Sequence, residues 1–150
     1  MVSIHDISVM SFSITDEHGN DSRYGRKLLE KVAGRLKKLF GDKAYDSKGI
    51  HNLLSRLGVK AAIPPRKNAS TQARGSPARA RIVRQVRKIG EDQWKKENGY
   101  GRRWLVEIFF SGLKRTMGEV VKARKPDNIA QEIAMKVVWY NEMRRMTEAY

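Results

Sequence analysis

The sequence predicts an α/β domain followed by C-terminal helices. Short apolar segments alternate with amphipathic helical patterns in the N-terminal half, and two long helical patterns follow towards the C-terminus. The chain has 150 residues, enough for one compact domain, and a hydrophobic fraction of 40% provides apolar surface for a buried core. We therefore expect a folded chain in spite of its high charge.

The first expected elements are a strand and a helix. Between Ile7 and Thr15 apolar residues interleave with serines at a period of about two, which is typical of a strand. Residues 16–21 contain Asp, Gly and Asn, which favour a turn. A helix is predicted from Ser22 to Lys37, because its leucines and valine recur at the three- and four-residue spacing of one buried face.

A strand, a helix and another strand follow. Leu39 to Asp42 is a short apolar run that ends in a carboxylate, and we expect a buried strand there. Ser47 caps a helix through Leu57, and Gly58 stops it. Val59 to Ile63 is the next strand, which two prolines end. This order predicts a parallel pair of strands.

The region from about residue 64 to residue 90 is basic and contains no acidic side chain. Pro64 to Ala78 has the composition of a mobile loop, and Ala80 to Lys88 has a helical pattern. Because neutralised phosphates release counterions, we expect this region to bind a nucleic-acid backbone without reading bases. The alternative is a solvated surface without a partner. The cations proposed to contact phosphates are Arg66, Lys67, Arg79, Arg81 and Arg84.

Two helices complete the expected fold, one from about Tyr100 to Met117 and one from about Asn128 to Met146. Pro126 precedes the second helix, and Asp127 or Asn128 caps it. The first of these helices is apolar around most of its circumference, so we expect it to be largely buried.

The tryptophans and histidines have separate expected roles. Trp104 and Trp139 lie in the two helical patterns and are expected to pack, whereas Trp94, beside two lysines, is a candidate for stacking on a base. His5, His18 and His51 lack the spacing of a zinc site, so surface or turn positions are expected for them.

The charge of the chain limits the classes of partner that we expect it to bind. Lys and Arg number 31 against 16 Asp and Glu, and the net charge of +15 favours nucleic acid, an anionic membrane surface or an acidic protein. The basic region lacks the aromatic and leucine residues of a membrane-surface helix, so we expect no membrane role. The absence of cysteine excludes disulfides, thiolate metal sites and cysteine nucleophiles. No secretory signal or long apolar run is present, and a cytoplasmic location is expected.

Four polar residues share one side of the helix predicted from Tyr100. At 100° per residue, Tyr100, Glu107 and Lys114 all lie within about 60° of Arg103. A stripe of two cations, a carboxylate and a phenol on an otherwise apolar helix must face water, a cleft or bound anions. The alternative is an ordinary ion pair between Arg103 and Glu107, four residues apart on a solvated face.

The spacing of Tyr100, Arg103, Glu107 and Lys114 resembles the Tyr-Arg-Glu-Lys motif of the DDE transposases of bacterial and archaeal insertion sequences. Gly41-Asp42-Lys43-Ala44-Tyr45-Asp46-Ser47 is similar to the strand-end motif of that family, with Ala44 where the family usually has Gly. Residues 15–21 and 63–66 also resemble segments of the family. The matches follow one another in order from about Ser8 to Glu142.

The resemblance implies an RNase H-like mixed sheet with flanking helices, followed by C-terminal helices. In the family a first catalytic Asp lies on a strand that precedes the segments matched here. We therefore expect residues 1–150 to be the C-terminal part of a catalytic domain, incomplete at the N-terminus and inactive alone.

The resemblance also implies metal-dependent DNA cleavage and strand transfer. Asp42 and Glu107 would be catalytic carboxylates that hold Mg²⁺ or Mn²⁺, and Tyr100, Arg103 and Lys114 would contact phosphates. The implied partners are DNA, at element ends and target, together with a second copy or a complementing transposase chain. For Asp42 the other role is a cap before the helix at Ser47, which we assign to Asp46 instead.

Two other interpretations are open at this point. In the first, the chain is a non-catalytic nucleic-acid-binding module in which Asp42 and Glu107 are structural. In the second, it is a decayed reading frame without a selected function.

Overall fold

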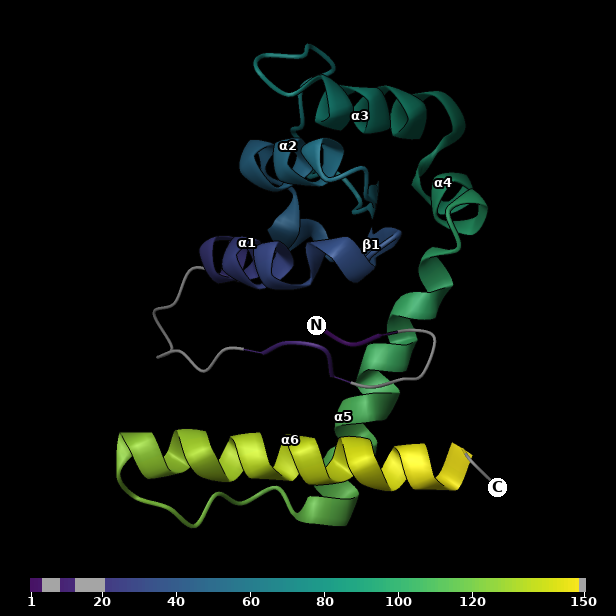
Figure 1. Cartoon of the computed structure of the whole chain (residues 1–150). Helices are drawn as coiled ribbons and strands as arrows, with labels where there is room; N and C mark the ends of the chain where they lie inside the picture. Colours follow the sequence, from purple (N-terminus) through teal and green to yellow (C-terminus); the bar gives the residue numbers. More distant parts are fainter. Residues whose placement is uncertain (4–8, 13–20, 149–150) are drawn as a thin grey trace. The chain divides into compact units, whose positions relative to one another are not determined.

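The computed structural model describes residues 1–3, 9–12 and 21–148. The chain forms two compact units, Thr15–Arg103 and a second that combines Met1–Ile14 with Trp104–Tyr150 (Figure 1). His5, His18 and most of the expected first strand and turn lie outside the described residues. Within 9–12, Val9 forms one antiparallel bridge with Val2 in place of the expected strand.

The unit Thr15–Arg103 contains the predicted strand–helix–strand arrangement. Strand β1 is Lys38–Phe40, helix α2 is Lys48–Arg56 and strand β2 is Lys60–Ala62. The strands are parallel with Leu39 opposite Ala61, which confirms the α/β prediction for this segment. Both strands are shorter than predicted, and β1 is half-buried. Within the described residues the named strands form only this two-stranded sheet, so a larger mixed sheet is not seen there.

Helix α2 begins and ends where the sequence predicts. The Ser47 hydroxyl accepts a hydrogen bond from the Ile50 N–H at 3.3 Å. Gly58 has a φ of +68°, the left-handed conformation that glycine adopts most readily after a helix. Ile50, Leu53 and Leu54 are buried, and burial of each such side chain stabilises the fold by about 1.5–3 kcal/mol.

Helix α1, Asp21–Val32, precedes this unit's sheet and ends in the short 3₁₀ turn η1, Ala33–Arg35. The predicted helix to Lys37 is therefore too long at its C-terminus, where Gly34 disfavours α-helix. Leu29 and Val32 are buried. Helix α2 packs against α1 (Figure 1).

Much of the basic region is helical. Helix α3 is Pro77–Ile89 and helix α4 is Glu91–Glu97, and α3 packs against both α2 and α4. The helix predicted over Ala80–Lys88 is confirmed. The loop expected over Pro64–Ala78 ends at Ser76, because α3 starts at Pro77. The remaining loop is also anchored by buried residues, namely Pro64, Pro65, Ala69 and Ser76.

A buried carboxylate joins several segments of this unit. The Asp46 side chain is fully buried, and the Arg79 guanidinium of α3 donates to its two oxygens at 2.7 and 2.6 Å. The Arg66 backbone N–H donates to it at 2.8 Å, and His51 Nε2 of α2 lies 3.1 Å away. Burial would raise the pKa of Asp46, but the hydrogen bonds from His51, Arg79 and Arg66 outweigh it and hold that pKa well below its usual range. The surface or turn role expected for His51 is wrong, because the residue is 1% exposed.

The second unit contains helix α5, Trp104–Met117, and helix α6, Pro126–Glu148. The two helices approach closely at Gly112, where a Cβ atom would lie 1.9 Å from the Tyr140 hydroxyl oxygen. Phe109 is buried, and its ring meets that of Tyr140 edge to face with centroids 5.0 Å apart. The predicted C-terminal helix is confirmed, but it begins at Pro126, so the capping role expected for Asp127 or Asn128 is wrong.

The exposure of this second unit differs from the sequence prediction. Trp104 and Trp139 are 55% and 60% exposed, so neither packs as expected. Ile108 and Phe110 of α5 are also exposed, and α5 is not largely buried. Within this unit each helix packs along one side against the other, which leaves apolar residues on its remaining sides exposed. Among the helices described, none has the length and apolarity needed to cross a membrane.

We expect Asp46→Asn to lower the free energy of unfolding by about 3 kcal/mol, because the substitution leaves the guanidinium of Arg79 without its buried anion. Urea denaturation followed by circular dichroism measures this change. The matched control is Glu30→Gln, which breaks the exposed Arg26–Glu30 pair and should cost less than about 0.5 kcal/mol.

The difference in stability between wild type and Asp46→Asn should depend on pH in a defined way. The pKa of Asp46 is lower in the folded than in the unfolded state, whose value is near 3.8, so its stabilisation is complete above that value and is lost as the pH falls further. The stability difference between wild type and Asp46→Asn should stay constant from about pH 5 to 7 and shrink below about pH 4. A difference that grows on acidification would contradict this assignment.

Candidate functional site at the end of strand β1

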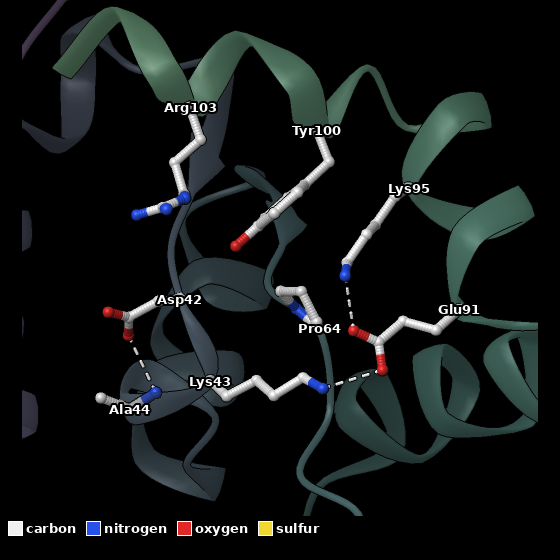
Figure 2. A pocket seen from close by; sticks show the side chains of 8 residues that line it. All are labelled: Asp42, Lys43, Ala44, Pro64, Glu91, Lys95, Tyr100 and Arg103. Atoms are coloured by element: carbon white, nitrogen blue, oxygen red, sulfur yellow. Dashed lines mark hydrogen bonds and ion pairs between the residues drawn. The ribbon is translucent and has the colours of Figure 1, made fainter. Parts of the chain in front are cut away.

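An open pocket of about 470 Å³ lies where β1 ends (Figure 2). Chain segments after β1 and β2 form one part of its wall, and α4 and the turn that follows α4 form the rest. In α/β proteins, the carboxyl ends of parallel strands are the usual position for binding sites. The lining residues are Asp42, Lys43, Ala44, Pro64, Glu91, Lys95, Tyr100 and Arg103.

Asp42 lies two residues after the end of β1 and is exposed. Its carboxylate accepts a hydrogen bond from the Ala44 N–H at 2.8 Å and so caps the 3₁₀ turn η2, Lys43–Tyr45. Asp46 does not cap α2, because Ser47 does, and its carboxylate is used in the buried cluster instead. Asp42 thus caps the turn η2 and not α2, and it does so in the pocket where the sequence predicts a functional carboxylate.

Tyr100 and Arg103 occupy the 3₁₀ turn η3, Tyr100–Arg103, and both side chains extend into the pocket on the side of Asp42 (Figure 2). With three residues per 3₁₀ turn, positions three apart share a side. The Tyr100 hydroxyl donates to the Gly41 carbonyl at 3.1 Å, which fixes the end of β1. Burial raises the pKa of Tyr100 above its ordinary value in spite of the nearby Arg103, so the phenol is protonated at neutral pH.

Glu107 and Lys114 lie on α5, in the second unit, and both are exposed. The Lys114 ammonium lies 3.9 Å from a carboxylate oxygen of Glu119. The prediction of one continuous α-helical stripe from Tyr100 to Lys114 is wrong, because α5 begins only at Trp104 and the 3₁₀ turn before it has a different angular step. The spacing of Glu107 and Lys114 within α5 is as predicted.

Glu91 is a pocket residue that the sequence interpretation did not include. Its carboxylate binds the ammonium groups of Lys43 and Lys95 at 2.8 and 2.7 Å (Figure 2). The hydrogen bond from Lys43 is the main cause that lowers the pKa of Glu91, and Lys95 adds to it. The available signal was its position, since Glu91 is the first acidic residue after the long basic region.

The five basic residues singled out in the sequence divide into two groups. Arg79 binds Asp46, and the Arg66 guanidinium donates to the carbonyls of Lys43 and Ala44, at 3.2 Å each. These two arginines therefore stabilise the fold around the pocket. The other three are exposed, namely Lys67, Arg81 and Arg84.

Trp94 does not fit the predicted role of stacking on a base. Its side chain is 1% exposed, in α4, which packs against α3 and η3. The two lysines that follow Trp94 in sequence indicate an exposed position, but the helix turns the indole inward and leaves Lys96 exposed.

The described residues do not assemble a complete metal site. Among them, no three Asp, Glu, His or Cys side chains lie close enough to share an ion. Asp42 supplies one exposed carboxylate to the pocket, and Glu91 is bound by two lysines. A two-metal centre needs more oxygen ligands than this pocket brings together.

The comparison with protein families covers nearly the whole chain. The family model described as a transposase DDE domain matches residues 1–141. No solved structure matches the chain. The matched range includes the pocket at the end of β1 as well as Glu107 and Lys114. The chain therefore belongs to the transposase DDE domain family.

Proposed function

We propose that this chain acts in DNA transposition as the C-terminal part of an insertion-sequence transposase. The observation that carries the proposal is the meeting of Asp42, Tyr100 and Arg103 in one pocket, in a chain that belongs to the DDE family. A guanidinium suits the two oxygens of a phosphodiester, and an exposed carboxylate suits a hard cation beside it. The Tyr100 hydroxyl is used to hold Gly41, so we assign Tyr100 to positioning and Arg103 to phosphate contact.

Asp42 and Glu107 are the proposed carboxylate ligands of Mg²⁺ or Mn²⁺. Such an ion, when bound, supplies charge stabilisation to a reacting phosphodiester. Because the described residues do not complete the site, we propose that a further carboxylate comes from an earlier strand or from a complementing transposase chain. The chain alone is then inactive in cleavage.

The exposed cations give the proposed DNA contact its charge. The sequence has no acidic residue between Asp46 and Glu91, and Lys67, Arg81 and Arg84 lie exposed in this interval. Phosphate contacts of this kind give affinity that falls steeply with salt and does not depend on base sequence. DNA is therefore the proposed partner, and Lys114 is a further candidate for phosphate contact from α5.

A second candidate function is a non-catalytic nucleic-acid-binding module. The hydrogen bond from the Ala44 N–H to Asp42 favours it, since this carboxylate already has a structural role as a cap. In that case Asp42 needs no metal, and DNA binding is unaffected by divalent cations.

The first test is a nicking assay on supercoiled DNA with Mg²⁺ or Mn²⁺. We expect no cleavage by the chain alone. Asp42 and Glu107 supply only two of the carboxylates that the metal site requires, and the described residues do not complete it. Metal-dependent cleavage that disappears in Glu107→Ala would contradict the proposed inactivity. Cleavage that persists in both Asp42→Ala and Glu107→Ala would identify a contaminating nuclease.

The second test distinguishes the two candidate functions by metal binding and needs no measurement of activity. We expect Mn²⁺ to broaden the amide NMR signals of Lys43 and Ala44 and to leave Gly34 unaffected. Asp42→Asn retains an oxygen that can cap η2 but removes the charge, so it should abolish the broadening. Equal broadening in wild type and Asp42→Asn, or none in either, would favour the non-catalytic module.

A further inference from the structure

A second pocket lies between α2 and the start of α3, and it shares no lining residue with the pocket at the end of β1. Its volume is about 380 Å³. Its polar wall comes from one side of α2 and from the turn that leads into α3. The residues that matter here are Asn52, Ser55 and Arg56 from α2, with Gly75, Ala78 and Arg81.

Two arginines, Arg56 and Arg81, line this second pocket. Both side chains are exposed, and neither forms an ion pair within the described part of the chain. The nearest acidic residues in sequence are Asp46 and Glu91, and each is already bound by cations elsewhere. The pocket is therefore a concentration of positive charge that lacks an anion of its own.

The turn before α3 is held in place against α2. The Asn52 side-chain amide donates to the Gly75 carbonyl at 2.8 Å, and the Ser76 N–H donates to the Ala73 carbonyl at 2.7 Å. Arg74 and Gly75 both have positive φ, +39° and +83°. For Arg74 this conformation is unfavourable and persists only where the surrounding contacts impose it.

The start of α3 adds donors to the same pocket. Ser76 is the cap residue of this 13-residue helix, but its side chain makes no capping hydrogen bond. The Ser76 hydroxyl is also buried, with no hydrogen-bond partner among the described residues. Pro77, the first residue of α3, has no N–H group, so the backbone donors of this helix begin at Ala78, in the pocket wall, and no capping side chain satisfies them.

From these observations we propose that the pocket between α2 and α3 binds a phosphate group, held between the guanidinium groups of Arg56 and Arg81. A guanidinium presents paired N–H donors that match phosphate oxygens, and two of them can hold one phosphate from two sides. Ser55 and the start of α3 supply further donors. For the source of the phosphate the inference rests on the proposed function, which makes it a phosphate of the DNA backbone. This phosphate would bind at a place separate from Asp42.

The test measures binding of a short DNA duplex to the full chain by fluorescence anisotropy at several salt concentrations. We expect Arg56→Gln and Arg81→Gln each to weaken binding roughly tenfold, equally for unrelated sequences. Because both residues hold one phosphate, the double variant should lose less than the product of the two single losses. Its plot of log K against log salt should be shallower by about one unit.

The matched control is Arg35→Gln, which removes one exposed arginine from η1 and should change affinity less than about twofold. Thermal unfolding of each variant confirms that it is folded. An Arg56→Gln loss no greater than that of Arg35→Gln would overturn the inference. Losses that multiply fully in the double variant would also overturn it, because they indicate two independent surface charges.

Inorganic phosphate serves as a second probe that does not depend on the proposed function. Titration should shift the amide NMR signals of Ser55, Gly75 and Ala78, and Arg81→Gln should suppress those shifts. Such shifts without any duplex binding would contradict the proposed function and identify the pocket as a site for a free phosphate group. The absence of shifts with both probes would overturn the inference itself.

Discussion

The unit Thr15–Arg103 depends on the hydrogen bonds and the ion pair that the buried carboxylate of Asp46 forms. This carboxylate fixes α3 through Arg79, α2 through His51 and the segment after β2 through the Arg66 backbone. The side chain of Arg66 donates hydrogen bonds to two carbonyls of the turn that follows Asp42. One charge, removed from water and matched by several donors, thus sets the position of the turn that carries Asp42 and the packing of α3 on α2. The pocket at the end of β1 and the pocket between α2 and α3 both lie next to segments that this cluster anchors.

The cations of the chain divide into those that bind groups of the fold and those that have no acidic partner among the described residues, and this division changes the meaning of its +15 charge. Arg79 and Arg66 bind groups of the fold, and Lys43 and Lys95 share Glu91. Arg56 and Arg81, by contrast, line a pocket without an acidic partner among the described residues. A count of basic residues therefore overstates the charge that the proposed DNA partner would meet, and the cations without an acidic partner are the ones that we propose to contact it.

The sequence predicts the local parts of this fold better than the distant contacts. The ends of α2 follow from Ser47 and Gly58, because capping and left-handed backbone are decided within a few residues. Likewise the motifs that resemble those of the DDE family predict Asp42, Tyr100 and Arg103 as site residues, and all three line one pocket. Other features depend on residues far apart in sequence. These are the burial of Trp94 and His51 and the ion pair between Glu91 and Lys43. Periodicity carries no information on such contacts, and it also gave no sign of the change to 3₁₀ backbone at Tyr100.

We propose that DNA binds at the end of β1, beside Asp42. Because the chain has no cysteine, a single introduced thiol reports on one position, and Ala44→Cys places it in the wall of that pocket. The matched control is Gly34→Cys on η1, where an added Cβ meets no atom within 4 Å. The direct measurement is the rate of thiol alkylation with and without duplex DNA. We expect DNA to slow alkylation at position 44 at least about tenfold and to leave position 34 unchanged. Equal rates at position 44 with and without saturating DNA would contradict the account.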